Sequence, residues 1–284
     1  MRGIFFAIIL LLIGSLLIPL IITTSCDLQV PQNKGMARDE ILESDLQINV
    51  YNHETKKIMN LALEEYVMQV VGAEMPASFE IEALKAQAVA ARTYVIWRRM
   101  TEGEAGNGAH PGACVCTSHT HCQEWLSMEE LKSRHGASWI KELWPRIEEA
   151  VKSTRGIIMT YNMEVIQPLY HSSSGGKTEN SEDVFASALP YLKSVSSPFE
   201  EEAPVFMDKK EIPIGDFIKS LQTKEKTFKI DRKNILAEIQ ILERNLGGSI
   251  KNIKIGNKNF TGSEIRKIFD LRSADFTIDG DKNN

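Results

Sequence analysis

The sequence predicts an α+β protein in which one mixed helix and sheet domain follows a single N-terminal transmembrane helix. Two observations predict the mixed domain. Strand-like alternation and helical periodicity both occur, and they do not follow one another in the regular order of a doubly wound sheet. A third observation, a long N-terminal run without charge, predicts the transmembrane helix. Hydrophobic residues make up 43% of the chain, which is ordinary for a protein that buries a core.

The uncharged run extends from Ile4 to Thr23. It is long enough to cross a bilayer core of roughly 30 Å as a helix. Arg2 is the only charge before it, so the cation bias places the N-terminal end in the cytoplasm and the rest of the chain outside. We therefore expect a cytoplasmic stub and anchor over residues 1–25 and a flexible linker over residues 26–45. A cleaved secretory signal is the alternative.

The folded part is predicted over residues 46–284 and begins with a β-hairpin. Residues 46–51 alternate between apolar and polar side chains, and a turn-like segment over residues 52–54 follows them. Apolar residues then recur at helical spacing over residues 61–74. This helix is expected to stop there because Pro76 disfavours helical geometry in the residue before it.

A second helix, rich in alanine, is predicted from an N-cap at Ser78 to about Arg99. Helical periodicity also covers residues 127–153, and a hairpin is predicted around residues 161–164. The C-terminal part is predicted to contain a helix over residues 214–222, a helix or strand over 235–241, and a strand, turn and helix over 250–269.

The charge balance argues against a nucleic-acid partner. The chain carries 33 Lys and Arg against 38 Asp and Glu, a net charge of −5. Nucleic-acid-binding domains usually show a basic patch or a high pI, and no long basic block occurs here. We therefore expect no nucleic acid among the partners.

Glu74 ends the first predicted helix directly before Met75 and Pro76. A carboxyl group at the negative end of a helix, beside apolar neighbours, is favoured in its protonated form. A protonated carboxyl group can act as a general acid. Glu74 is therefore a candidate catalytic residue, and a solvated helix-end glutamate without a special role is the alternative.

Residues 108–124 form a loop rich in metal-ligand side chains. Three of the four cysteines and three of the six histidines fall between His110 and Cys122. Two thiolates and two imidazoles would suit a tetrahedral zinc ion, although the spacing is not that of a zinc finger. A disulfide is the alternative, because an extracytoplasmic location permits one. A zinc-dependent hydrolase would in addition need a vacant coordination position.

Residues 170–178 (YHSSSGGKT) form a strand that runs into a turn of small residues. Their hydroxyl and backbone groups suit the binding of a polyhydroxylated ligand. The stretch lacks the Gly-x-Ser-x-Gly form of a nucleophile elbow, which weakens the alternative of a Ser-His-acid hydrolase. An ordinary polar turn is the other alternative.

With these stretches, the chain resembles the stage II sporulation protein D family and, more distantly, the amidase-enhancer proteins. The resemblance is carried by LEEYVMQVVGAEMPASFEIEALKAQAVAARTYV (63–95), by HSSSGGKTENSEDVFASALPYLKSVSSP (171–198) and by FTGSEIRKIFDLRSADFTI (260–278). It implies a catalytic domain with a substrate groove. The implied activity is that of a lytic transglycosylase, which cleaves the β-1,4 bond between N-acetylmuramic acid and N-acetylglucosamine in peptide-stripped glycan strands. Such cleavage leaves 1,6-anhydro ends, here during engulfment in endospore formation.

The resemblance also implies roles for individual residues. Glu74 stands at the family's catalytic acid/base position in the Glu-Met-Pro block. The residues that match the family's substrate groove are Arg92, Ser173, Gly175, Gly176, Thr178, Tyr191 and Lys193. Some family members carry a zinc ion after the second helix. The residues that match this zinc pattern are His110, Cys116, His121 and Cys122, a closed set that implies a structural ion.

Partners and location follow from the same resemblance. It implies peptidoglycan glycan strands as substrate, a cell-wall amidase (stage II sporulation protein P) and a membrane scaffold (stage II sporulation protein M). It places the protein in the mother-cell engulfing membrane, with the folded part facing the space between mother cell and forespore. The alternative function is a non-catalytic glycan-binding scaffold that enhances an amidase.

Overall fold

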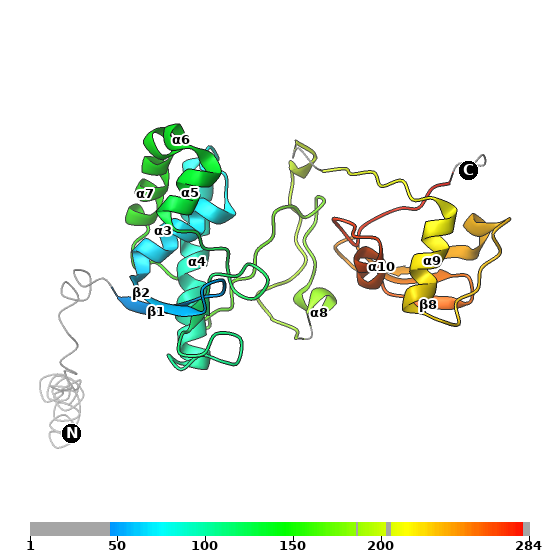
Figure 1. Cartoon of the computed structure of the whole chain (residues 1–284), viewed down its shortest axis with the longest axis horizontal. Helices are drawn as coiled ribbons and strands as arrows, with labels where there is room; N and C mark the ends of the chain where they lie inside the picture. The colour runs from blue at the N-terminus through cyan, green and yellow to red at the C-terminus, as the bar shows by residue number, and fades with distance from the viewer. Residues whose placement is uncertain (1–45, 186, 203–205, 281–284) are drawn as a thin grey trace, which may run out of the picture. The chain divides into compact units, whose positions relative to one another are not determined.

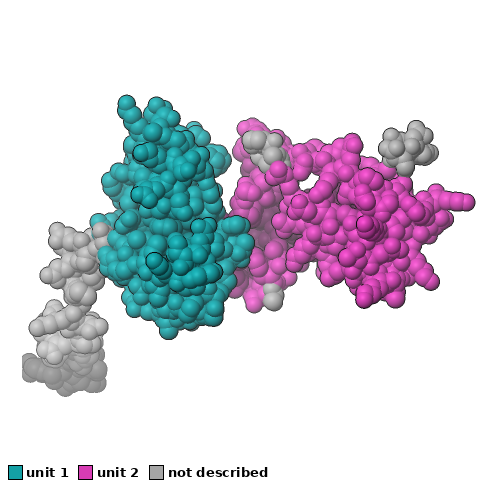
Figure 2. Space-filling view, viewed as in Figure 1, with its two compact units in different colours: residues 1–159, 165–167 teal, residues 160–164, 168–284 magenta. Residues whose placement is uncertain are grey.

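The computed structural model describes residues 46–185, 187–202 and 206–280 (Figure 1). It divides into two compact units (Figure 2). Unit 1 holds the described residues through Met159 and residues 165–167, and unit 2 holds residues 160–164 and the described residues from Pro168 onward. The mixed α+β class is confirmed, since both helices and antiparallel strands are present.

The two units have separate hydrophobic cores, whereas the sequence analysis expects one domain over residues 46–284. The cores are separate because the described residues of a long part of the chain between them contribute almost no buried side chains. Between Val151 and Leu221, the buried side chains of the described residues are those of Thr154, Pro168 and Ser181. Each unit therefore has its own apolar centre.

The predicted anchor over residues 1–25 and the linker over residues 26–45 lie outside the described residues. Within the described part of the chain, no helix is both long enough and apolar enough to span a bilayer. The transmembrane anchor therefore stays a prediction.

Unit 1 opens with the predicted hairpin. Strand β1 (Gln47–Asn52) pairs antiparallel with β2 (Lys57–Ala62). A two-residue strand that the sequence analysis did not predict, β3 (Val115–Cys116), pairs in parallel with the other edge of β1. In this register Cys116 lies opposite Tyr51, so the sheet holds one side of the Cys- and His-rich loop.

Helix α3 (Leu63–Glu74) follows β2 directly and packs on α4 (Ile81–Glu102). The end of α3 is as predicted, because Met75 before Pro76 is extended. The N-cap prediction for Ser78 is wrong. A turn closed by a hydrogen bond from the N–H of Phe79 to the carbonyl of Pro76 occupies this segment, and α4 begins only after it.

The predicted helix over residues 127–153 is three helices, α5 (Met128–His135), α6 (Ala137–Glu142) and α7 (Trp144–Ser153). Gly136 separates the first two with a φ of 91°, which glycine adopts at little steric cost. Ser127 caps α5 as part of a capping box with Glu130. Helix α7 packs against α3 and α4 and completes the core of unit 1.

The first residues of unit 2, residues 160–164, include strand β4 (Thr160–Tyr161), which pairs with β5 (Glu164–Val165) near the predicted turn. Its core lies between a three-stranded antiparallel sheet and two helices (Figure 1). The strands are β6 (Ile239–Arg244), β7 (Ile250–Ile255) and β8 (Lys258–Phe260), and the helices are α9 (Ile214–Lys224) and α10 (Gly262–Ile268). The smaller elements are α8 (Ser181–Val184), η1 (Glu200–Glu202) and η2 (Ile235–Glu238).

Candidate functional site

Glu74 lies half-buried at the C-terminal end of α3. Its Oε1 accepts a hydrogen bond of 2.7 Å from the backbone N–H of Glu124. Among the described residues, no hydrogen bond to its Oε2 is found. One oxygen of this carboxyl group is therefore held by the protein, and the other has no hydrogen-bond partner in the described part of the chain.

The residue that holds Glu74 is itself part of an ion pair. The Glu124 carboxylate accepts hydrogen bonds from Arg134 Nη2 at 2.7 Å and from Arg134 Nη1 at 3.2 Å. These bonds hold the pKa of Glu124 below its ordinary value and raise the pKa of Arg134. Arg134 belongs to α5, so the segment that contacts Glu74 is tied to that helix.

The four predicted zinc ligands come together in unit 1. His121 Nδ1 lies 3.3 Å from Cys122 Sγ and 3.8 Å from Cys116 Sγ. The rings of His110 and His121 have centroids 5.0 Å apart. Ligand atoms of His110, His121 and Cys122 all lie within 4.8 Å of one another. We call these four residues the Cys/His cluster.

The environment of His110 fits a metal ligand. The ring is fully buried, and its Nδ1–H donates to the carbonyl of Ala113 at 2.7 Å, which leaves the lone pair of the neutral ring on Nε2. A guanidinium nitrogen of Arg98 donates to Nε2 at 2.7 Å, so a zinc ion bound at this atom would displace that hydrogen bond. Two sulfurs and two imidazoles are the donor set that zinc prefers. The residues present therefore fit a zinc ion.

The two thiol groups of the cluster differ in pKa. A hydrogen bond with Cys116 lowers the pKa of Cys122 to about 4 and raises that of Cys116, which favours one thiolate in the cluster. The three described cysteines are free. Cys114 donates to the carbonyl of Asn49 at 3.7 Å, and His119 is exposed, so neither is grouped with the ligands.

Arg92, predicted for a substrate groove, lies in the core of unit 1 with 1% of its surface exposed. Its Nε and Nη2 donate to the Glu64 carboxylate at 2.8 and 2.7 Å. Nη1 and Nη2 also donate to the carbonyls of Ile157 and Val151. Every guanidinium nitrogen has a protein acceptor. This arginine joins α4 to the start of α3 and to the end of α7, and its expected contact with substrate stays a prediction.

The other predicted groove residues belong to unit 2, and Glu74 belongs to unit 1. They are Ser173, Gly175, Gly176, Thr178, Tyr191 and Lys193. Thr178 exchanges hydrogen bonds with Val195, and Lys193 pairs with Glu182 at 2.7 Å. The tilted rings of Tyr191 and Tyr161 lie 5.6 Å apart.

The small-residue turn of unit 2 contacts a carboxylate that the sequence analysis missed. The hydroxyls of Ser173, Ser174 and Ser197 donate to Glu200 at 2.8, 3.0 and 3.0 Å. These hydroxyl hydrogen bonds hold the pKa of Glu200 below its ordinary value. The turn is therefore tied to a residue 26 positions beyond Ser174, which no local pattern indicates.

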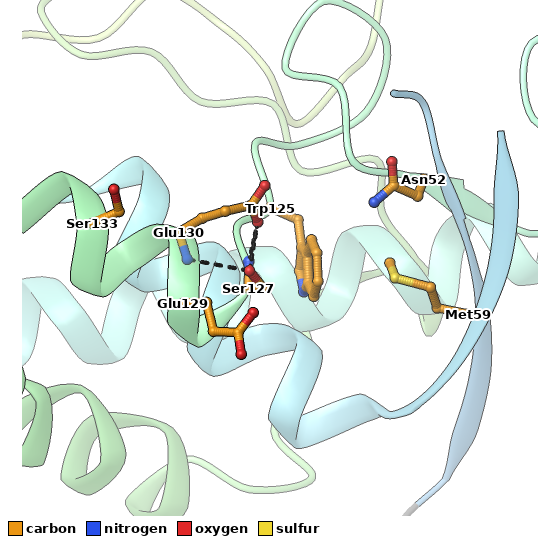
Figure 3. Close-up of a pocket in the computed structure, with 7 residues that line it drawn as sticks. All are labelled: Asn52, Met59, Trp125, Ser127, Glu129, Glu130 and Ser133. Atoms are coloured by element: carbon orange, nitrogen blue, oxygen red, sulfur yellow. Dashed lines mark hydrogen bonds between the residues drawn. The ribbon is translucent and has the colours of Figure 1, made fainter. Parts of the chain in front are cut away.

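A surface pocket of about 370 Å³ adjoins the segment after Glu124 (Figure 3). Its lining residues are Asn52, Met59, Trp125, Ser127, Glu129, Glu130 and Ser133. The dashed lines in Figure 3 are the capping-box hydrogen bonds between Ser127 and Glu130. Glu124 and Arg134 were not predicted as site residues either. In the chain they lie directly before and directly after the pocket-lining residues of the segment 125–133. The only sequence signal for Glu124 is its position two residues after Cys122.

Comparisons with known proteins identify the class to which this fold and site belong. Residues 51–161, which include Glu74 and the Cys/His cluster, match the family model described as Stage II sporulation protein. The chain is 36% identical over 246 residues to stage II sporulation protein D of Bacillus subtilis (strain 168), which covers 87% of this chain and 68% of that protein. It is 34% identical over 247 residues to stage II sporulation protein D of Bacillus amyloliquefaciens, with the same coverage.

A third relative is the amidase enhancer of Bacillus subtilis (strain 168), 37% identical over 123 residues. This match covers 43% of the chain and 14% of that protein. The chain belongs to the stage II sporulation protein D family of sporulation proteins. The resemblance predicted from the sequence is confirmed.

Proposed function

We propose that the chain is a lytic transglycosylase that cleaves the β-1,4 bond between N-acetylmuramic acid and N-acetylglucosamine in peptide-stripped glycan strands, leaving 1,6-anhydro ends. The observation that carries the proposal is the carboxyl group of Glu74, held through Oε1 and without a hydrogen bond to Oε2 among the described residues. Family membership supports a role in sporulation, and we place the reaction in engulfment.

One carboxyl group is enough for this reaction because the nucleophile belongs to the substrate. Hydrolytic glycosidases generally use two carboxyl groups, one to protonate the leaving oxygen and one as nucleophile or base. Here Glu74 Oε2 gives its proton to the glycosidic oxygen as the C1–O bond breaks. The resulting carboxylate then takes the proton from the C6 hydroxyl of muramic acid as O6 bonds to C1. No water is consumed.

The hydrogen bond from Glu124 supports this assignment of the proton. A backbone N–H can only donate, so Glu74 Oε1 acts as an acceptor while that bond lasts. The transferable proton is then confined to Oε2, for which the described residues supply no hydrogen-bond partner. The bond also orients the carboxyl plane, which a proton transfer to one particular oxygen of the substrate requires.

We also propose that the Cys/His cluster binds a structural zinc ion. The supporting observations are the grouping of His110, Cys116, His121 and Cys122 and the orientation of His110 by the carbonyl of Ala113. Four protein ligands would close the coordination sphere. A bound ion would cross-link the loop that leads to Glu124, and it takes no part in the proton transfers.

The location and the partners complete the proposal. The uncharged run near the N-terminus supports a membrane anchor with the folded units outside the cytoplasm, in the engulfing membrane of the mother cell.

We propose a cell-wall amidase, stage II sporulation protein P, and a membrane scaffold, stage II sporulation protein M, as partners. Similarity to a protein named amidase enhancer supports a link with an amidase. It also favours the second candidate function, a glycan-binding scaffold that does not cleave.

The experiment that separates the two functions compares the whole 284-residue chain with its Glu74→Gln variant on peptide-free glycan strands. We expect 1,6-anhydro products from the unmodified chain. A loss of rate on the order of 10² to 10⁴ is expected in the variant, because its amide cannot donate the carboxyl proton. Mass spectrometry of the products gives both results. Products with ordinary reducing ends would contradict the mechanism, and binding without cleavage by the unmodified chain would favour the scaffold.

A further inference from the structure

We propose that Arg134 is a positioning residue for Glu74 and that it acts through Glu124. This inference rests on the proposed function of Glu74. Arg134 itself bonds to Glu124, and the Glu124 backbone bonds to Glu74. Two hydrogen-bonded contacts therefore separate the guanidinium from the reacting carboxyl group.

The first link is the N–H of Glu124, 2.7 Å from Glu74 Oε1. A backbone donor can orient a carboxyl group only if its own segment is held in place. On its N-terminal side the segment is held by the turn in which the N–H of Cys122 bonds to the carbonyl of Ser118. On its C-terminal side Trp125 is 94% buried, since only 6% of its surface is exposed. The remaining freedom is that of Glu124 itself.

The second contact, the ion pair of Arg134 with Glu124, restricts the movement of Glu124. The two parallel hydrogen bonds between Arg134 and the Glu124 carboxylate form a fork, which fixes direction as well as distance. Without the arginine, the Glu124 side chain would lose both of these hydrogen bonds and would be free to move.

The third contact is the packing of α5 on α3, the helix that carries Glu74. Helix α5 starts at the capping box and buries Leu131 completely. A Cβ atom added to Gly72 would lie 3.3 Å from Leu131 Cδ1, so α5 meets α3 two residues before Glu74. The contacts form a closed ring from α3 to α5, through Arg134 and Glu124, and back to the end of α3.

The closed ring predicts a defect in the reaction rather than in binding. Arg134 has no substrate contact in the proposed mechanism, so its loss should leave KM unchanged. Misorientation of Glu74 should lower kcat on the order of tenfold, because proton transfer depends strongly on geometry. The amide of Glu124 should also exchange its hydrogen faster, since its acceptor is no longer aligned.

The test uses the whole chain with Arg134→Ala, Glu124→Ala and the double variant, each assayed for kcat and KM on peptide-free glycan strands. Hydrogen exchange of the peptide that contains Glu124 is measured in parallel. The double variant should be no slower than either single variant, because both remove the same contact. Arg134→Lys should recover part of the rate, since it restores charge without the fork.

The matched control is Lys152→Ala, which breaks the exposed ion pair between Lys152 and Glu148 on α7. It should leave kcat and the exchange of the Glu124 peptide unchanged. An Arg134→Ala variant with unaltered kcat and exchange would overturn the proposal, as would a rise in KM without a fall in kcat. If the unmodified chain forms no anhydro products, the proposed function fails. The exchange measurement still decides whether Arg134 holds the Glu124 amide.

Discussion

Glu74 and Arg92 illustrate at the residue scale how hydrogen bonding separates a reactive group from a structural one. Arg92 is 1% exposed, and each of its guanidinium nitrogens is bonded to a protein acceptor. Glu74 is half-buried, and only Oε1 has a hydrogen-bond partner among the described residues. A side chain binds or reacts through the atoms that the protein leaves without partners. The arginine is therefore suited to holding helices together and the glutamate to reacting.

We predict that Arg92→Met destabilises unit 1 by about 3 to 5 kcal/mol, the usual cost of leaving one partner of a buried ion pair uncompensated. Glu64, whose side chain is 17% exposed, would lose its two hydrogen bonds to the guanidinium. Denaturant unfolding measures the change. The double variant Arg92→Met, Glu64→Leu should recover much of the stability, because no buried charge is left. An unchanged stability in the single variant would indicate that Arg92 serves a ligand instead.

Helix α5 shows at the element scale how one short helix connects the site to the core. It follows the Glu124 segment, begins at a capping box and packs on α3 through Leu131. The side of α3 that it meets carries Gly72, and a Cβ there would approach Trp144 to 3.2 Å and Leu131 to 3.3 Å. Glycine thus permits the close approach of α5 and α7 to α3.

We predict that Gly72→Val destabilises the protein by about 1 to 3 kcal/mol, because it overpacks the contact between α3 and its two neighbours. The same substitution at Gly108, where an added Cβ meets nothing within 4 Å, is the matched control. Thermal unfolding of both variants measures the difference. Equal stabilities for the two variants would show that α5 does not pack closely on α3.

At the scale of the whole molecule, the described residues form two units with separate cores, and the Cys/His cluster lies in only one of them. A ligand that binds only the folded form stabilises the unit that binds it. Zinc should therefore stabilise unit 1 and leave the stability of unit 2 unchanged.

We predict that a chelator lowers the unfolding temperature of unit 1 alone. Free zinc at 100 times its Kd would stabilise that unit by about 2.7 kcal/mol. Calorimetry with and without chelator measures the shift, and metal analysis gives the stoichiometry. Cys116→Ala should abolish both the bound zinc and the shift, whereas His119→Ala, at an exposed position outside the cluster, should retain both. Full zinc occupancy in Cys116→Ala would contradict the ligand assignment.

Features that depend on local patterns could be predicted from the amino-acid sequence. The hairpin of β1 and β2 follows from alternation, and the end of α3 follows from Pro76. The family follows from blocks of adjacent residues, and the four zinc-ligand candidates follow from the resemblance to that family. Each of these features can be recognised within a short window of the chain.

The environments of the charged groups and the number of hydrophobic cores could not be predicted without the folded structure. The N–H that holds Glu74 comes from a residue 50 positions away, and a carbonyl that accepts from Arg92 comes from one 65 positions away. The strand β3, the three-way division of the helical segment over residues 127–153 and the two cores likewise depend on packing. The physical reason is that burial and hydrogen bonding are set by the neighbours of a side chain in space, which local periodicity does not encode.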